Sequence, residues 1–306
     1  MLSNVIASQV TLHAEYGGVV PELASRQHVE AVIPVLDEAL EQAACGLEEI
    51  DAIAITYGPG LAGALLVGAN FGKALAYALG KPLIPVNHLE GHIYAGWLDN
   101  DEPQEFPVLA LIVSGGHSDV VLMEEHGRYQ RIGETVDDAA GEAFDKVARL
   151  LGLGFPGGPA IDRLSQTAPK ASLKLPRARL DRPYDFSFSG LKTKVQRIVR
   201  GEEGAVPDTA ELAAAFQESV VDSLVTKAVA AAEENGARRI ILAGGVAANS
   251  LLRQELAARA PVPVIAPPPV LCTDNGAMIA ACGYYRMQAG VTGALDLDVE
   301  PGLRIG

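Results

Sequence analysis

The stretch "IDAIAITYGPGLAGALLVGANFGKALAYALGKPLIPVNHLEGH", residues 50–92, decides the fold class of this chain. A β-branched run at 50–57 ends in a Gly-Pro-Gly turn, and an apolar, glycine-rich helix is predicted over 61–80. A second short strand at 81–86 precedes Asn87, whose side chain can cap the next helix. The order strand, helix, strand, helix is typical of an α/β protein in which helices cover a parallel sheet.

The same stretch resembles a membrane span at first sight, because no residue between Asp51 and Lys73 is charged. The Gly-Pro-Gly turn splits it into a strand and a helix, and we expect neither piece to be long enough to cross a bilayer. We therefore predict buried core here and no contact with a membrane.

Bulk composition indicates a cytoplasmic enzyme of more than one part. The 306 residues exceed one ordinary domain, and 49% are apolar, with 32 glycines. Cys45, Cys272 and Cys282 are too few and too scattered for a disulfide framework, so reduced thiols are expected. No basic segment followed by an apolar run begins at Met1, so we expect no signal peptide.

A second unit begins near residue 105. The segment "EFPVLALIVSGGHSDVVLM" (105–123) predicts a hairpin around Ser114-Gly115-Gly116-His117, whose bare amides suit phosphate or carboxylate oxygens. A strand followed by Gly-Gly recurs at 240–245. Helices are predicted over 135–152 and 208–235, with mostly irregular chain between them.

Two histidines form the clearest candidate metal site. His88 and His92 are four residues apart, so both side chains leave one helix face about 6 Å apart at Cβ. Asp274, in "VLCTDNGAMIA" (270–280), is the best third ligand, and such a set suits iron(II) or zinc. The alternative is an ordinary pair of histidines. A zinc protease would place its glutamate directly after the first histidine, whereas Glu90 comes two residues later.

Polar side chains near the glycine turns are candidate nucleoside contacts. Asp145 and Asp162 flank the glycine pair at 157–158. Asp145 can bond ribose hydroxyls or pair with neighbouring cations. Asn249 can reach an adenine or ribose, or cap the helix that follows it.

Charge is distributed unevenly along the chain. Between Arg163 and Arg200 ten Lys and Arg residues face two acids, Asp181 and Asp185, a local charge of +8. Because the whole chain carries −14, the remainder carries −22. The segment is either a solvated basic loop or a binding surface for a phosphate backbone. In the second case the rest of the protein, which is acidic, would repel nucleic acid.

Nine motifs occur in the same order as in one protein family. They are "GGVVPELASRQH", "GPGLAGALLVG", "NHLEGH", "IVSGGH", "DDAAGEAFDK", "PGGP", "DFSFSGLKT", "GGVAAN" and "CTDNGAMIA". From about Glu15 to Arg304 the chain resembles the bacterial tRNA N6-adenosine threonylcarbamoyltransferases, the TsaD proteins, once described as O-sialoglycoprotein endopeptidases. The resemblance implies an actin-like, Hsp70-like ATPase (ASKHA) fold of two RNase H-like lobes around a central cleft.

The resemblance also implies boundaries. We expect a first lobe over 1–104 that carries the histidine pair, a second lobe over 105–275, and a C-terminal helix and tail over 276–306 that return to the first lobe. Family members open with a hairpin bearing a Gly-Ile-Glu-Thr-Ser-Cys-Asp loop, and this chain begins where that hairpin ends. We therefore expect an N-terminally truncated first lobe and weakened activity.

The implied activity is acyl transfer. A threonylcarbamoyl group moves from threonylcarbamoyl-adenylate to N6 of the adenosine 3′ of the anticodon, in tRNAs that read codons beginning with adenine, and AMP is released. By motif, the metal ligands, for iron(II) or zinc, are His88, His92 and Asp274. The loop at the phosphate and acyl end matches Ile112, Val113, Ser114, Gly115 and Gly116. The nucleoside contacts of ATP or the adenylate match Asp145, Gly158, Asp162 and Asn249. No residue stands out as a general base.

Partners follow from the same resemblance. They are tRNA, a TsaB-like paralogue that packs on the first lobe, a small TsaE-like P-loop ATPase, and a synthase that supplies threonylcarbamoyl-adenylate. Two alternatives remain at this point: a catalytically impaired scaffold that binds tRNA and partner subunits, and a metalloprotease.

Overall fold

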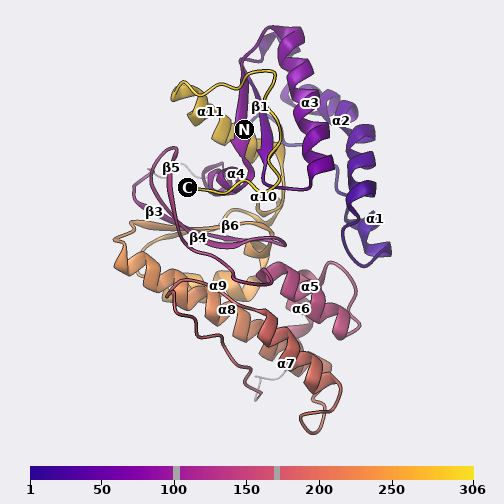
Figure 1. Cartoon of the computed structure of the whole chain (residues 1–306), viewed down its shortest axis with the longest axis vertical. Coiled ribbons are helices and arrows are strands. Elements are labelled where there is room, and N and C mark those ends of the chain that lie inside the picture. Colours follow the sequence, from indigo (N-terminus) through magenta and orange to yellow (C-terminus); the bar gives the residue numbers. More distant parts are fainter. Residues whose placement is uncertain (99–103, 169–172) are drawn as a thin grey trace. The chain divides into compact units, whose positions relative to one another are not determined.

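The chain forms two compact units (Figure 1). The computed structural model describes residues 1–98, 104–168 and 173–306. Unit 1 comprises Met1–Asp101 and Thr273–Gly306, and unit 2 comprises Glu102–Cys272. The division made from sequence placed residues 273–275 in the second lobe, but their contacts lie in unit 1, because Asn275 caps a helix that packs on the unit 1 strands.

Unit 1 contains a two-stranded parallel sheet and the helices around it. Its elements are α1 (Val10–Glu15), α2 (Pro21–Ala43), η1 (Leu47–Glu49), β1 (Ile53–Gly58), α3 (Ala62–Leu79), β2 (Leu83–Asn87), α4 (His88–Tyr94), η2 (Ala95–Trp97) and α11 (Gly276–Gln288). The predicted order strand, helix, strand, helix over 50–92 is confirmed.

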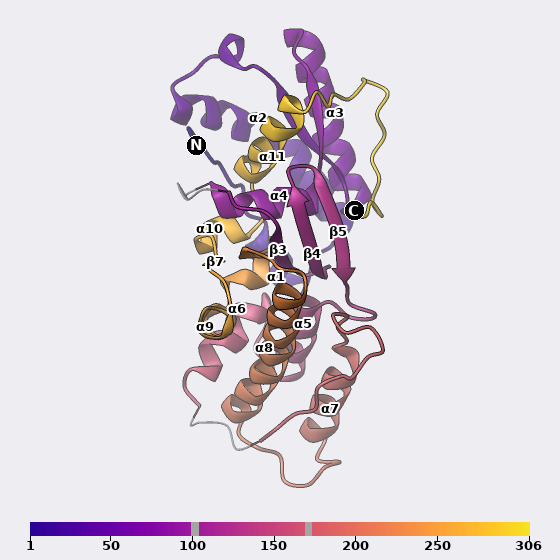
Figure 2. The ribbon, with the colours of Figure 1, turned by 90° about the vertical axis from the view of Figure 1, so that its left-hand side faces the viewer.

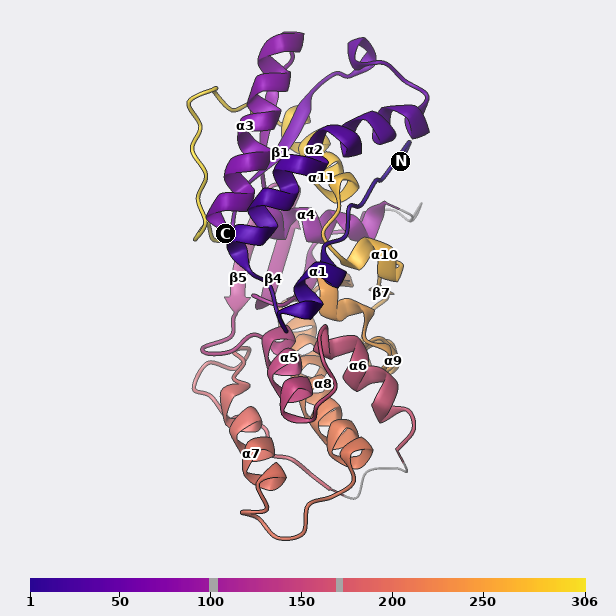
Figure 3. The same cartoon turned by 90° about the vertical axis from the view of Figure 1, so that its right-hand side faces the viewer.

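Two helices enclose β1, one on each face (Figures 1 and 3). Neighbouring strand residues point to opposite faces, and each meets a glycine. A Cβ on Gly72 of α3 would lie 2.2 Å from Ile55 Cγ2, and one on Gly283 of α11 would lie 2.7 Å from Ala54 Cβ. Glycine at both positions therefore allows α3 and α11 to approach the strand closely.

The length of α3 corrects one expectation. With 18 residues it is long and apolar enough to cross a membrane by length and composition, so the expectation that neither piece reaches that length is wrong for the helix. One such helix is weak evidence for a membrane span, because the core helices of soluble proteins meet the same criteria of length and composition. The predicted buried core is confirmed only for one stripe of α3, made of Leu65, Ala69, Gly72 and Ala76.

The C-terminal tail completes unit 1. The Glu300 amide donates to the Tyr57 carbonyl at the end of β1 at 2.7 Å. The Gly293 amide donates to the Leu83 carbonyl of β2 at 2.8 Å. Residues far apart in sequence thus share the backbone hydrogen bonds of the same two strands.

Unit 2 is built on a five-stranded mixed sheet of order β5-β4-β3-β6-β7. Its elements are β3 (Val108–Val113), β4 (Ser118–Glu125), β5 (Arg128–Gly133), α5 (Ala140–Leu150), α6 (Gly157–Ser165), α7 (Ser189–Val199), α8 (Thr209–Glu234), β6 (Arg239–Ala243), η3 (Gly245–Ala248), α9 (Ser250–Arg259), β7 (Val264–Ile265) and α10 (Pro269–Cys272). The predicted hairpin is β3–β4, and β3 also pairs in parallel with β6.

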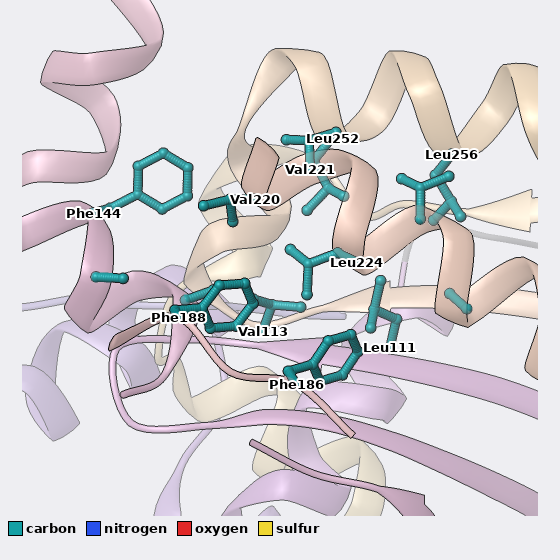
Figure 4. Close-up of a cluster of buried hydrophobic side chains, with 14 of the residues drawn as sticks. Leu111, Val113, Phe144, Phe186, Phe188, Val220, Val221, Leu224, Leu252 and Leu256 are labelled. Atoms are coloured by element: carbon teal, nitrogen blue, oxygen red, sulfur yellow. The ribbon is translucent and has the colours of Figure 1, made fainter. Parts of the chain in front are cut away.

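Helices α5 to α9 gather on one side of this sheet (Figure 2). Leu111 and Val113 of β3 point into the layer between sheet and helices, where Phe144 of α5 and Leu224 of α8 meet them (Figure 4). This apolar layer holds the ends of the strands and the helix N-termini in fixed relation, and the predicted turn at Ser114–Gly116 follows the end of β3.

The segment predicted as irregular contains two helices, α6 and α7. In α7 the buried residues Leu191, Val195 and Ile198 are spaced i, i+4 and i+7. That period is visible in the sequence and indicates a helix, so the prediction of a basic loop is wrong for α7. Residues 169–172 of the basic segment, including Lys170, lie outside the described residues, as do 99–103 at the predicted end of the first lobe.

Candidate functional site

The cap of α4 sets the direction of both histidines. Asn87 ends β2, and its Oδ1 accepts a hydrogen bond from the Leu89 amide at 2.8 Å, as predicted. Its Nδ2 donates to the carbonyl of Arg304 in the C-terminal tail at 3.0 Å. The His88 and His92 rings meet edge to face with centroids 4.6 Å apart. The four-residue spacing thus places both imidazoles on one face of α4.

Asp274 reaches the histidines from the residue before the cap of α11. Asn275 caps this helix, with its Oδ1 accepting from the Met278 amide at 2.9 Å. Asp274 Oδ1 then lies 3.4 Å from His88 Nε2 and 3.3 Å from His92 Nε2. The three predicted ligands therefore converge within unit 1.

Their separations fit a divalent ion. Two ligand atoms, each about 2.1 Å from a tetrahedral ion, lie about 3.4 Å apart. This is the spacing between the Asp274 carboxylate and each imidazole. One ligand atom from each residue can be chosen so that all three lie within 4.8 Å of one another. Three ligands of this kind leave coordination positions for a substrate oxygen.

The electrostatics of the cluster favour the ligating forms. Burial lowers the pKa of His92, although the hydrogen bond to Asp274 partly opposes this, so the imidazole stays neutral, as a metal ligand must. Desolvation raises the pKa of Asp274, but hydrogen bonds from His88 and His92 outweigh it and leave that pKa below its usual range. The carboxylate is nevertheless 78% exposed, so solvent screens these interactions and a metal ion can reach it from solution.

Glu90 is engaged away from the ligand set. Its carboxylate oxygens accept hydrogen bonds from Arg286 Nη1 at 3.0 and 3.2 Å. An ion pair directs the carboxylate toward the guanidinium and lowers its basicity, which is unfavourable for a base that must act on a metal-bound water. The geometry therefore argues against the metalloprotease alternative.

In unit 2 the turn between β3 and β4 presents backbone amides. The Ser114 amide donates to the His117 carbonyl at 2.8 Å, and the His117 amide donates to Ser114 Oγ at 3.1 Å. These bonds close the turn, leaving Gly115 and Gly116 exposed at its tip. Within the described residues, neither glycine amide has a hydrogen-bond acceptor. The tip can therefore donate to an anionic oxygen.

Two close approaches hold this turn in place. A Cβ on Gly141 of α5 would lie 2.5 Å from the Ser114 carbonyl oxygen, and one on Gly244 would lie 2.4 Å from the Val113 carbonyl oxygen. Ser118 Oγ accepts from the amide of Ala140 at 2.9 Å, which brings the start of α5 to the turn. The sequence gives no hint of this role for Ser118, because a serine after a glycine turn carries no distinctive signal.

The other two residues of the predicted phosphate loop, Ile112 and Val113, belong to the strand before the turn. Ile112 and Val113 are fully buried within β3. Their side chains fix the strand, so only their backbone is available for a ligand.

The predicted nucleoside contacts already cap helices. Asp145 Oδ1 accepts from the Gly157 amide at 2.7 Å, and burial raises the pKa of Asp145. Asp162 accepts from the amide and hydroxyl of Ser250 at 3.1 and 2.7 Å. These bonds tie α5, α6 and α9 together. The side chains are therefore ordered at the helix N-termini, with part of their bonding capacity used.

Asn249 adopts the alternative role that its sequence position allowed. Its Oδ1 accepts from the Leu252 amide at 2.9 Å, so it caps α9. Its Nδ2 donates to Gln217 Oε1 of α8 at 2.9 Å. Gly158 is open, since a Cβ added there would have no atom within 4 Å. Gln217 had no sequence signal, because α8 brings it to Asn249 only in the folded chain.

A buried carboxyl beside the turn makes stability depend on pH. Asp119 is 3% exposed, and burial raises its pKa to about 6 despite Arg131. Because its pKa is higher when folded than the unfolded value of 3.8, its stabilising contribution is present below pH 3.8 and is lost as pH rises through 6. We expect Asp119→Asn to raise the free energy of unfolding at pH 8 by about 1–3 kcal/mol, since one pKa unit is worth about 1.4 kcal/mol.

Urea denaturation at pH 4 and pH 8 measures this effect. The gain should shrink at pH 4, where the carboxyl of the parent chain is protonated. Asp51→Asn, at an exposed position, is the control. An equal gain for Asp119→Asn at both pH values would show that the buried charge is not its cause.

The basic segment is largely neutralised by acids from elsewhere in unit 2. Arg177 pairs with Asp222 at 2.6 Å, and Lys192 pairs with Asp138 at 3.2 Å. The other cations with acidic partners are Arg182, Lys194, Arg197 and Arg200. Among the described residues, the cations of the segment that have no acidic partner are Arg163, Lys174 and Arg179. The local +8 counted along the sequence therefore overstates the free positive charge.

Comparison with known proteins identifies the family. The model of the family described as "tRNA N6-adenosine threonylcarbamoyltransferase" matches residues 1–281. The protein of that name from Dehalococcoides mccartyi is 57% identical over 305 residues, covering 100% of this chain and 92% of that protein. The one from Thermomicrobium roseum is 56% identical over 326 residues, covering 98% of this chain and 89% of its own length.

Solved structures agree on the fold. The crystal structure of HypF from T. kodakarensis superposes with a TM-score of 0.63 at 16% identity, over 84% of this chain and 43% of that one. Full-length HypF in its phosphate- and nucleotide-bound form superposes with a TM-score of 0.60 at 14% identity. The match covers 86% of this chain and 50% of that one. The predicted α/β fold of the actin-like, Hsp70-like ATPase class is confirmed. With the family model spanning most of its length and relatives at 56–57% identity, the chain belongs to the tRNA N6-adenosine threonylcarbamoyltransferase family.

Proposed function

We propose that this chain transfers a threonylcarbamoyl group from threonylcarbamoyl-adenylate to N6 of the adenosine 3′ of the anticodon of tRNA, releasing AMP. The observation that carries the proposal is the convergence of His88, His92 and Asp274 in a chain of this family. The resemblance that pointed to this substrate covers nearly the whole sequence.

The reaction is an acyl transfer at a mixed anhydride. The N6 amine attacks the carbonyl carbon, a C–N bond forms, and the bond from carbon to the phosphate oxygen breaks. AMP leaves with the electron pair, and the amine loses a proton. An aromatic amine becomes acidic once attack begins, so positioning can replace a dedicated base.

We propose that His88, His92 and Asp274 hold one divalent ion, iron(II) or zinc. A bound ion would polarise the acyl-phosphate oxygens and offset the charge on departing AMP. We also propose that the Gly115 and Gly116 amides donate to phosphate oxygens of ATP or the adenylate. The nucleoside would then contact four residues near the starts of α6 and α9: Asp145, Gly158, Asp162 and Asn249.

The purified chain supplied with synthetic threonylcarbamoyl-adenylate and unmodified tRNA tests the proposal. Mass spectrometry of the digested tRNA should show the modified nucleoside, in an amount equal to the AMP released. A chain that binds tRNA but produces neither the modified nucleoside nor AMP above the no-protein background would support the scaffold alternative. Hydrolysis of casein that requires His88 would support the protease alternative.

Contact with tRNA is proposed for the unpaired cations of the basic segment. Arg179→Gln should weaken tRNA binding about 3- to 10-fold and reduce the slope of log K against log salt by somewhat less than one, because one phosphate contact is lost. Arg128→Gln is the matched control, since Arg128 is exposed but paired with Glu124 and Glu125. Filter binding at several salt concentrations measures both. Equal slopes for the two variants would exclude Arg179 from the interface.

Partner binding is proposed for one face of unit 1. Val29 and Ile33 of α2 are 61% and 59% exposed and lie one turn apart, and Leu66 of α3, which packs beside α2, is 43% exposed. We propose that a TsaB-like paralogue covers this face. A TsaE-like P-loop ATPase and a synthase that makes threonylcarbamoyl-adenylate would act with the pair in the cytoplasm, where Cys45, Cys272 and Cys282 remain reduced.

A further inference from the structure

A buried ion pair joins α4 to α11, the two helices that carry the candidate metal ligands. Glu90 Oε2 and Oε1 lie 3.0 and 3.2 Å from Arg286 Nη1. The side chains are 10% and 20% exposed. The thiol of Cys282, one turn before Arg286 on α11, donates to Glu90 Oε2 at 3.6 Å. Glu90 is thus bonded twice to the same face of α11.

The backbone of α4 also lies against side chains of α11 at the neighbouring residue. A Cβ on Gly91 would lie 2.6 Å from Ile279 Cδ1 and 3.5 Å from Met278 Cγ. Glycine therefore lets α4 settle against the first turn of α11. Together, Gly91 and Glu90 define the distance and the register between the helices.

This register determines the geometry of the ligand set. Glu90 lies between His88 and His92 in α4, and α11 begins two residues after Asp274. A sliding of α4 along α11 by one ångström would change both distances from Asp274 to the imidazoles, now 3.4 and 3.3 Å. Metal sites tolerate deviations of only about 0.2 Å in their bond lengths.

We propose that Glu90 and Arg286 are positioning residues, which hold His88 and His92 at the correct distance from Asp274 for a divalent ion. The proposal rests on the metal centre proposed above. A buried ion pair adds little net stability relative to apolar side chains of similar size, because desolvation offsets the attraction. Its directional bonds do restrict how two helices can slide, and that restriction is what a three-ligand site requires.

Cobalt(II) titration of the metal-free protein tests the assignment, because affinity and the visible spectrum report on ligand geometry without any transfer assay. Glu90→Gln removes the charge while keeping the shape. The double variant Glu90→Leu with Arg286→Met removes both charges and keeps the volume, so neither charge is left buried alone. Arg259→Met is the matched control, because Arg259 pairs with Asp222 at 2.7 Å in unit 2.

Both variants at the ion pair should bind cobalt about 10- to 100-fold more weakly than the parent, as for other residues that support metal ligands. Their spectra should broaden or shift, and the double variant should keep the melting temperature of the metal-free parent. Arg259→Met should bind cobalt as the parent does. Parent-like affinity and spectrum in a folded Glu90→Gln or double variant would overturn the proposal.

Two further outcomes are informative. If neither variant folds, the ion pair is a requirement of the fold and the positioning assignment is wrong. If the parent itself binds no cobalt, or binds it equally well after His88→Ala, the metal centre fails rather than its support. The two proposals are thus tested separately.

Discussion

His92→Ala should release the metal and reduce tRNA modification at least 100-fold. His92 is the most deeply buried of the three proposed ligands, and its Nε2 lies 3.3 Å from Asp274 Oδ1. Removing it leaves one imidazole and one exposed carboxylate, too few protein ligands for a stable catalytic site. The loss of a Lewis acid at an acyl-phosphate costs several kcal/mol of transition-state stabilisation, and each 1.4 kcal/mol is about tenfold in rate.

Elemental analysis of the purified protein and mass spectrometry of the modified nucleoside measure the two effects. His126→Ala is the control, since His126 is a partly buried histidine of unit 2 whose ring packs on Phe106. It should change neither metal content nor transfer. A His92→Ala protein that keeps stoichiometric metal and normal transfer would show that the cluster is not the metal centre.

Gly141→Ala should weaken binding of ATP or the adenylate about 10- to 100-fold and lower stability by about 1–3 kcal/mol. The added methyl would lie 2.5 Å from the Ser114 carbonyl oxygen and 2.9 Å from Gly115 Cα. Both are backbone atoms of the turn, so no side chain can rotate away to relieve the contact. The turn must move, and the proposed amide donors move with it.

Calorimetric titration with ATP measures the change in affinity between the parent and Gly141→Ala. Thermal unfolding of the same two proteins measures the change in stability. Gly190→Ala in α7 is the control, because no atom lies within 4 Å of its Cβ position. It should bind ATP as the parent does and gain slightly in stability, since alanine is the better helix former. Unchanged ATP affinity in Gly141→Ala would exclude the Ser114–His117 turn from the nucleotide site.

The sequence alone determined the features that depend on residues close together in the chain, namely the elements of unit 1 around the histidines and the spacing of the histidine pair. The β-branched run, the Gly-Pro-Gly turn and the apolar, glycine-rich segment after it predicted β1, α3 and β2, and Asn87 predicted the start of α4. The four-residue spacing of His88 and His92 placed both on one helix face. These relations span a few residues, so backbone geometry and side-chain periodicity are enough to establish them.

Only the tertiary structure decided which distant groups meet. Asp274 lies 186 residues after His88, and it joins the histidines because α11 packs on β1 and α4. The sequence places Glu90 on another helix face than the histidines, and packing brings it to Arg286. Arg177 contributes to the local charge counted along the sequence, but Asp222, 45 residues later, neutralises it in the folded chain. Each of these outcomes depends on long-range packing and on electrostatic partners, and no period or spacing along the chain specifies either.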